Sequence, residues 1–119
     1  MRYQRGDVIE IPFSIPGKNR QENYPAIIIS NSDVHNNEDL YICVIITHSD
    51  INNFLAFELS NYMFVNNEKA PDGNAKAHLI VSVSERDIIT NSRSKQHRMK
   101  SVYVDKLVDF ITEMVFLEK

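Results

Sequence analysis

The chain has 119 residues, a formal net charge of −3 and a single cysteine, Cys43. This length predicts one domain spanning residues 1–119, and the mild acidity excludes a globally basic nucleic-acid binder. A lone cysteine cannot form an internal disulfide, the four histidines show no ligand spacing, and no apolar run reaches the length of a membrane span. We therefore expect a cytoplasmic protein with no metal, no cofactor and no membrane contact.

Short runs of β-branched residues dominate the chain, which holds 14 isoleucines and 10 valines but only 3 glycines. Such runs are typical of strands, and five are predicted, at residues 8–13, 26–30, 40–46, 54–59 and 78–84. The second and third runs are apolar on both faces and are expected in the centre of a sheet. Pro12 marks the first run as an edge strand or a bulge. Residues 31–39 predict a turn or short helical bend, and residues 61–76 a long polar loop.

The C-terminal residues follow a different pattern. Residues 102–104 predict a last short strand, and from Asp105 the apolar side chains fall at helical spacing as far as Leu117, with Asp105 as the expected N-cap. Strands without intervening helices favour an antiparallel sheet or small barrel. The predicted fold class is therefore mainly β with one C-terminal α-helix. Eight of the 13 residues from 105 to 117 are apolar, so part of this helix is a candidate dimer contact.

Three stretches of the N-terminal half resemble a known family: residues 5–13 (RGDVIEIPF), 24–30 (YPAIIIS) and 45–49 (IITHS). They are similar to the corresponding stretches of the MazF/PemK-like toxins. The resemblance implies a small SH3-like barrel, a homodimer, and the toxin of a type II toxin–antitoxin pair whose partner is an antitoxin protein. Family members cut single-stranded RNA without a metal, through attack of the ribose 2′-hydroxyl on the adjacent phosphorus.

The same resemblance indicates candidate site residues. Thr47 stands at the family's threonine position, whereas the family arginine is Tyr24 here and a loop glutamate of some members is Asn19. Arg20 lies in the same loop and can supply the missing guanidinium, which clamps phosphate groups. Strand alternation points His48 away from the site if Thr47 faces it. We predict Arg20 and Thr47 as catalytic residues, and as substrate-binding residues Tyr24, His48, Ser49 and Arg86.

Two features leave alternatives open. Residues 86–100 carry five lysines or arginines against one acid, which is typical of a contact for an RNA backbone, of a docking surface for an acidic antitoxin tail, or of a solvated charged loop. The tyrosine at the arginine position keeps a second hypothesis open, a catalytically degenerate member that binds RNA or an antitoxin. A gyrase poison of the CcdB type is disfavoured, because that class depends on a Trp-Gly-Ile end and this chain has no tryptophan.

Overall fold

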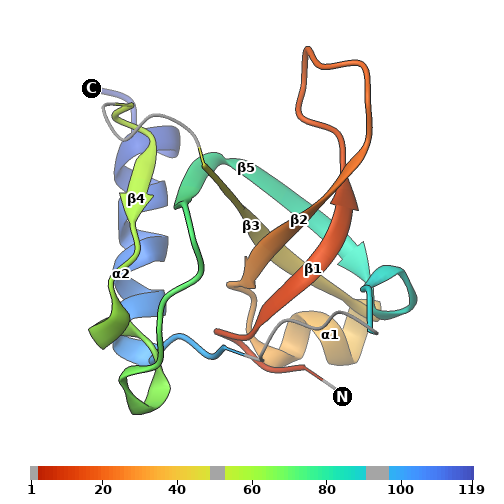
Figure 1. Cartoon of the computed structure of the whole chain (residues 1–119), viewed down its shortest axis with the longest axis horizontal. Coiled ribbons are helices and arrows are strands. Elements are labelled where there is room, and N and C mark those ends of the chain that lie inside the picture. Colours follow the sequence, from red (N-terminus) through yellow and green to blue (C-terminus); the bar gives the residue numbers. More distant parts are fainter. Residues whose placement is uncertain (1–2, 49–52, 91–96) are drawn as a thin grey trace.

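The computed structural model describes residues 3–48, 53–90 and 97–119. Five strands form one antiparallel sheet in the order β1-β2-β3-β5-β4 (Figure 1). The strands are β1 (Val8–Phe13), β2 (Glu22–Ile28), β3 (Leu40–Thr47), β4 (Ala56–Glu58) and β5 (Asn74–Ser84), and the helices are α1 (Ser32–Glu38) and α2 (Ser101–Ile111). The predicted antiparallel, mainly β fold with a C-terminal helix is confirmed, and β1 has its predicted bounds.

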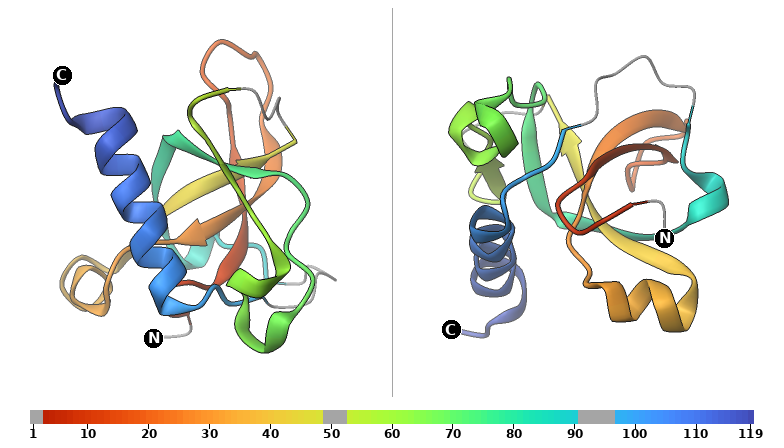
Figure 2. Two further views of the ribbon diagram at one scale, coloured as in Figure 1. Left: turned by 90° about the vertical axis from the view of Figure 1, so that its left-hand side faces the viewer. Right: turned by 90° about the horizontal axis from the view of Figure 1, so that it is seen from below.

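The central strand β3 is buried on both faces, which divides the core in two. Tyr41, Cys43 and Ile45 face one cluster, which also receives apolar side chains from β1. Val44 and Ile46 face the other cluster, which lies against α2. Figure 2 shows α2 on one side of the sheet and the curl of β1, β2 and β3 on the other. Because neither face of β3 meets water, its sequence is a continuous apolar run, and this run predicted its central position.

The pairing of β3 with β5 contains an offset. Val44 pairs with Ile80, whereas Ile46 pairs with Ala75, so β5 carries extra residues over this stretch. As a result, Ala75 lies in the core against α2, whereas Leu79 lies in the core beside β1. The offset lets β5 begin at Asn74, four residues earlier than predicted, with small and polar residues that lack a strand-like apolar pattern.

The predicted strand at residues 102–104 is wrong, because these residues form the first turn of α2. Val104 is buried together with Leu107 and Ile111, the i+3 and i+7 positions of one helical face. The same three side chains pack into the core against β3. Tertiary burial of this face therefore overrides the strand preference of two β-branched residues. The helix ends at Ile111 and a wider π-turn, Thr112–Phe116, follows it.

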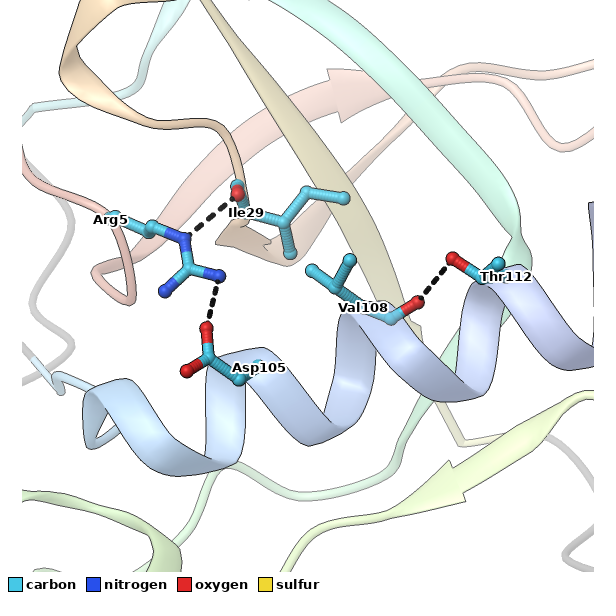
Figure 3. A network of polar contacts seen from close by, with 5 residues as sticks. All are labelled: Arg5, Ile29, Asp105, Val108 and Thr112. Carbon is cyan, nitrogen blue, oxygen red and sulfur yellow. Dashed lines mark hydrogen bonds and ion pairs between the residues drawn. The ribbon is translucent and has the colours of Figure 1, made fainter.

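Asp105 is not the N-cap of α2, a position that Lys100 holds. Its carboxylate instead pairs with the guanidinium of Arg5 at 2.8 Å (Figure 3). The Nε of Arg5 donates to the carbonyl oxygen of Ile29 at 3.2 Å. One arginine thus connects α2 to the chain just beyond β2. In the same view, the Thr112 hydroxyl donates to the carbonyl oxygen of Val108 at 2.9 Å, at the start of the π-turn.

The remaining elements differ from prediction mainly in length. Strand β2 begins and ends earlier than residues 26–30, β4 is shorter than residues 54–59, and the bend at residues 31–39 is the helix α1. The segment after β4 contains two 3₁₀ turns, Asn61–Met63 and Val65–Asn67, and it buries Met63 and Phe64. Phe64 forms an isolated bridge with Met99, so the segment packs against the chain that leads into α2. Across the three described ranges, no helix is long and apolar enough to cross a membrane.

Candidate functional site

The hairpin of β1 and β2 carries a connected group of polar side chains, which we call the hairpin trio: Arg20, Glu22 and Tyr24. The guanidinium of Arg20 lies 2.6 Å from one carboxylate oxygen of Glu22, and the Tyr24 hydroxyl donates to the other at 2.8 Å. The ring of Tyr24 packs edge-on against Phe13 across the hairpin, with centroids 6.2 Å apart. Glu22 is therefore a carboxylate held between a cation and a phenol on an exposed arm.

The acid–base character of Tyr24 follows from this arrangement. Its hydrogen bond to Glu22, followed by partial burial and the negative charge of Glu22, raises the pKa of the Tyr24 hydroxyl above its ordinary value. The phenol therefore keeps its proton at neutral pH. It acts as a hydrogen-bond donor and does not serve as a general base.

A second polar group, the strand-end trio, lies where β3 ends and β5 begins: Thr47, Asn74 and Lys76. They are the only polar or charged residues that are buried within the described ranges, with 8%, 6% and 5% of their surface exposed. Thr47 pairs directly with Asn74 in the sheet. Lys76 lies two residues further along β5, and strand alternation places it on the same face. The neighbouring Ala75 and Ala77 face the core against α2.

Lys76 is unusual because a lysine is seldom buried without an acidic partner. No carboxylate of the described residues forms an ion pair with it, and its cross-strand neighbour on β4 is the small Ala56. The positive charge of Lys76 contributes, after burial, to a lowered pKa of His78. A buried cation without a carboxylate is a site that favours an anionic ligand.

Gly73 supports the strand-end trio through a close backbone approach. Its φ of +108° lies in the region that favours glycine, and a Cβ at this position would fall onto the carbonyl oxygen of Thr47. The polar segment before β5 therefore ends directly against Thr47. The rest of this segment packs on the side of α2 and lies away from the β1–β2 hairpin (Figure 1).

The two trios share a face of the sheet. Strands β2 and β3 pair from Ile28 with Cys43 as far as Ala26 with Ile45. Beyond Ala26 the hairpin turns away from β3 (Figure 1). Tyr24 precedes Ala26 by two residues and Thr47 follows Ile45 by two, so strand alternation places both on the face of the same core. The structure thus joins Arg20 to Tyr24 through Glu22 and places Tyr24 and Thr47 on the same face.

The other predicted site residues lie elsewhere. His48 is exposed at the end of β3, and Ser49 lies outside the described residues. Arg86 follows β5 in a 3₁₀ turn, and the end of β5, Ser84, pairs with Leu40. Leu40 and Thr47 are the two ends of β3, about 23 Å apart at the rise of a strand. The structure therefore places Arg86 at the opposite end of the sheet from Thr47.

The basic segment at residues 86–100 does not form one surface within the described part. Arg98 binds the carboxylate of Asp7 at 2.7 Å, and Lys100 donates to the side chain of Asn67 at 3.3 Å. Arg93 and Lys95 lie outside the described residues. The described positive charges of this segment are thus either engaged with neighbouring side chains or, as with Arg86, at a separate corner.

Sequence reasoning missed Glu22 and Lys76, although a signal was present for each. The residues of the hairpin trio alternate along the chain, which is the period of side chains on one face of an extended strand. Asn74, Lys76 and His78 alternate in the same way between alanines. Among the described residues, no group of three His, Cys, Asp or Glu side chains is arranged to hold a metal ion.

Comparison with known proteins identifies the family. Residues 4–114 match the family of PemK-like, MazF-like toxins of type II toxin–antitoxin systems. The chain belongs to this family. The resemblance seen in its N-terminal half is therefore confirmed and extends over nearly the whole toxin. A search of curated proteins found no match.

Solved structures show the same fold at low sequence identity. A MazE–MazF complex from Deinococcus radiodurans matches with a TM-score of 0.66 and 12% identity over 98% of each chain. An endoribonuclease from Mycobacterial species matches with a TM-score of 0.68 and 12% identity, over 98% of this toxin and 94% of the other chain. An endoribonuclease in complex with its cognate antitoxin, also from Mycobacterial species, gives 0.64 and 14% over 98% of each chain. The expected MazF/PemK-type fold is thereby confirmed.

Proposed function

We propose that this toxin is an endoribonuclease that cleaves single-stranded RNA without a metal. The observation that carries the proposal is the buried Lys76 beside Thr47, a cation with no carboxylate partner among the described residues, on the face shared with the hairpin trio. RNA provides the anion that such a site favours, and its own 2′-hydroxyl provides the nucleophile. The likeness to structures described as endoribonucleases supports the same conclusion.

The residues of the two trios match the requirements of 2′-hydroxyl attack. Glu22 accepts the proton of the 2′-hydroxyl, whose oxygen then bonds to phosphorus. Negative charge develops on the phosphorane oxygens and is stabilised by the guanidinium of Arg20, the ammonium of Lys76 and the hydroxyl of Thr47. The bond from phosphorus to the 5′ oxygen breaks, and water protonates that oxygen. The products are a 2′,3′-cyclic phosphate and a 5′-hydroxyl end. Tyr24 donates to Glu22 and holds it in place.

The test is cleavage of single-stranded RNA by purified protein in excess EDTA, with the product ends identified by mass spectrometry. We expect Arg20→Ala and Thr47→Ala each to slow cleavage by ~10²-fold, the scale of one lost charge-stabilising donor. Glu22→Gln keeps the size of the side chain and the hydrogen bond from Tyr24 but removes the general base. It should slow cleavage by ~10²-fold or more relative to the unaltered protein. Lys18→Ala, which removes an exposed cation of the same loop, is the matched control and should cleave at the rate of the unaltered protein. RNA that stays intact with the unaltered protein refutes the enzymatic proposal.

A second candidate function is an RNA- or antitoxin-binding module that has lost cleavage. The observation in its favour is that Glu22 already pairs with Arg20 at 2.6 Å, at a hairpin that carries tyrosine where the family has arginine. Binding of RNA with unchanged ends after long incubation would select this function. Growth arrest that survives both Arg20→Ala and Thr47→Ala would point to a mode that does not involve cleavage.

The proposal includes two protein partners and a cellular site. A cognate antitoxin is expected from the family and from neighbours that are themselves toxin–antitoxin complexes. A homodimer is supported by exposed apolar side chains at the two ends of the C-terminal helix: Val102, Phe116 and Leu117. A messenger RNA substrate supports a cytoplasmic location for the protein. Light scattering of the purified toxin would show twice the chain mass, and Phe116→Glu should shift it toward one chain.

A further inference from the structure

A cavity of about 350 Å³ opens at the end of the sheet opposite to the β1–β2 hairpin. Tyr3, Gln4 and Arg5 form one wall, and the other walls come from the chain between β2 and α1 and from the start of β3. Figure 1 shows the N-terminal part of the chain beside α1, whereas the hairpin extends in the other direction. Tyr41 at the cavity and Thr47 in the strand-end trio are six residues apart on β3, about 20 Å at the rise of a strand. The cavity is therefore separate from the site proposed for RNA cleavage.

Two buried tyrosines provide the apolar part of the cavity lining. The rings of Tyr3 and Tyr41 pack edge to face with centroids 5.9 Å apart. The Tyr41 hydroxyl accepts from the N–H of Tyr3 at 3.4 Å and donates to Glu85 at 2.7 Å, and the Tyr41 ring stacks on His35. Because these contacts fix the aromatic wall in advance, a ligand does not have to order it on binding.

The polar part of the lining carries a positive charge. Arg5 is the only charged side chain among the described residues that line the cavity, and 28% of it is exposed, so a ligand can reach it. Its Nε and Nη2 atoms contact Ile29 and Asp105, whereas Nη1 forms no hydrogen bond or ion pair within the described part of the chain (Figure 3). The Ser32 hydroxyl and the Gln4 side-chain amide are likewise not engaged by any described residue. A guanidinium beside uncharged hydrogen-bond donors is a lining that suits an anionic group.

We propose that this cavity binds a small organic anion, in which a planar apolar body carries one terminal phosphate or carboxylate group. The anionic group pairs with Nη1 of Arg5, and the body lies against Tyr3 and Tyr41. The volume falls within the range of small-molecule sites, about 300–1,000 Å³, and is sufficient for one ring with its anionic group. The planar guanidinium matches the oxygens of both a phosphate and a carboxylate. This binding site goes beyond the proposed function and does not depend on RNA cleavage.

NMR titration of the isotope-labelled toxin with phenyl phosphate tests the site, because this probe carries both the ring and the anionic group. We expect saturable shifts of the signals of Tyr3, Ser32 and Tyr41, with half-saturation below about 10 mM. Inorganic phosphate lacks the ring and benzyl alcohol lacks the charge, so each should bind about 10-fold more weakly than phenyl phosphate. Benzoate in the same titration decides whether the site takes both anionic groups or the phosphate alone.

Two variants separate the contact with the anion from the ion pair that joins Arg5 to α2. Arg5→Gln removes both and should weaken the binding of phenyl phosphate by about 10-fold or more. Asp105→Asn is the matched control, because it breaks the same ion pair but keeps the guanidinium, and it should bind the probe at least as tightly as the unaltered toxin. Equal losses in the two variants, or no saturable shift up to about 10 mM phenyl phosphate, would overturn the inference.

Competition with RNA tests whether the cavity is a separate site. Excess 2′-O-methyl RNA, which lacks the nucleophile for cleavage, should leave the bound phenyl phosphate in place. Displacement of the probe would assign the cavity to the RNA-binding surface and overturn the inference. A toxin that binds the probe as described but never cleaves RNA refutes the proposed function and leaves this binding site supported.

Discussion

Replacing Lys76 with methionine should make the toxin more stable and less active at the same time. The two side chains have similar lengths, so Lys76→Met retains the packing of the stem and removes the charge. In the folded chain this lysine exposes only 5% of its surface and has no carboxylate partner among the described residues. Its ammonium group therefore loses hydration on folding without gaining an ion pair in return.

The expected size of both effects follows from this position. Substituting a buried ionic group by an apolar one of similar volume is often stabilising, by about 1–4 kcal/mol. Lys76 pairs with the small Ala56 on the three-residue edge strand β4, so it is buried at the margin of the sheet and not in the centre of the core. We therefore expect the lower part of that range, about 1–2 kcal/mol in the free energy of unfolding, or a rise of roughly 4–8 °C in Tm for a chain of this length. Loss of one charge that stabilises the phosphorane should slow cleavage by ~10²-fold.

Calorimetry and single-turnover RNA cleavage on the same preparations provide the measurement. Lys69→Met is the matched control, because Lys69 is exposed in the segment before β5, and its unfolding free energy should change by no more than about 0.5 kcal/mol. A Lys76→Met protein that is less stable than the parent and cleaves RNA at the parent's rate would refute the reasoning. That result would mean that the amine is hydrated and takes no part in the chemistry.

Three further outcomes follow from the structure. Gly73→Ala should lower the free energy of unfolding by about 2 kcal/mol or more, because the added Cβ meets the Thr47 carbonyl. Gly17→Ala, at φ +90° with open space around it, should lower it by only about 1 kcal/mol in chemical denaturation. Equal losses in the two variants would contradict this. The pKa of His78, lowered by burial and by Lys76, should rise in Lys76→Met when it is followed by NMR. Because the unfolded state binds the proton more readily, the unaltered protein should lose stability as pH falls below about 6.5. An unchanged His78 titration in Lys76→Met would show that the charge of Lys76 does not act on His78. Burial raises the pKa of the Cys43 thiol to about 12, so a thiol reagent at pH 8 should label it only upon unfolding, and rapid labelling of the folded protein would disprove its burial.

The sheet was predictable wherever burial alone decided the sequence pattern. The runs that form β1 and β3 alternate or stay apolar because each face meets either core or water, and both strands appear close to the predicted positions. The start of α2 was not predictable in this way. Val102 and Val104 favour a strand locally. Residues 102–104 are helical because Val104 is buried together with Leu107 and Ile111.

The residues of the candidate site also differ in whether local sequence could predict them. Thr47 is marked by the family's threonine position, and Arg20 by its loop. Glu22 becomes part of the site only through its contacts with two side chains of the same hairpin. The position of Lys76 depends on the offset between β3 and β5, which no local sequence pattern predicts. Arg86, whose local sequence looked equally suitable, lies at the far end of the same two strands.

The contacts between the first and last parts of the chain set the time at which the toxin becomes complete during its own synthesis. The N–H of Val8 donates to the carbonyl oxygen of His97, the N–H of Met99 donates to that of Gly6, and Arg5 pairs with Asp105 across 100 residues of sequence. At about 5–20 residues per second, a ribosome needs about 6–24 s to make the chain, and the residues that complete these contacts emerge in the last few seconds. Until then the outer edge of β1 and the core beneath α2 stay open. A growing chain thus carries the hairpin trio, and after Lys76 the strand-end trio as well, without the fold that would align them, so neither trio is in place until the C-terminal helix has been made.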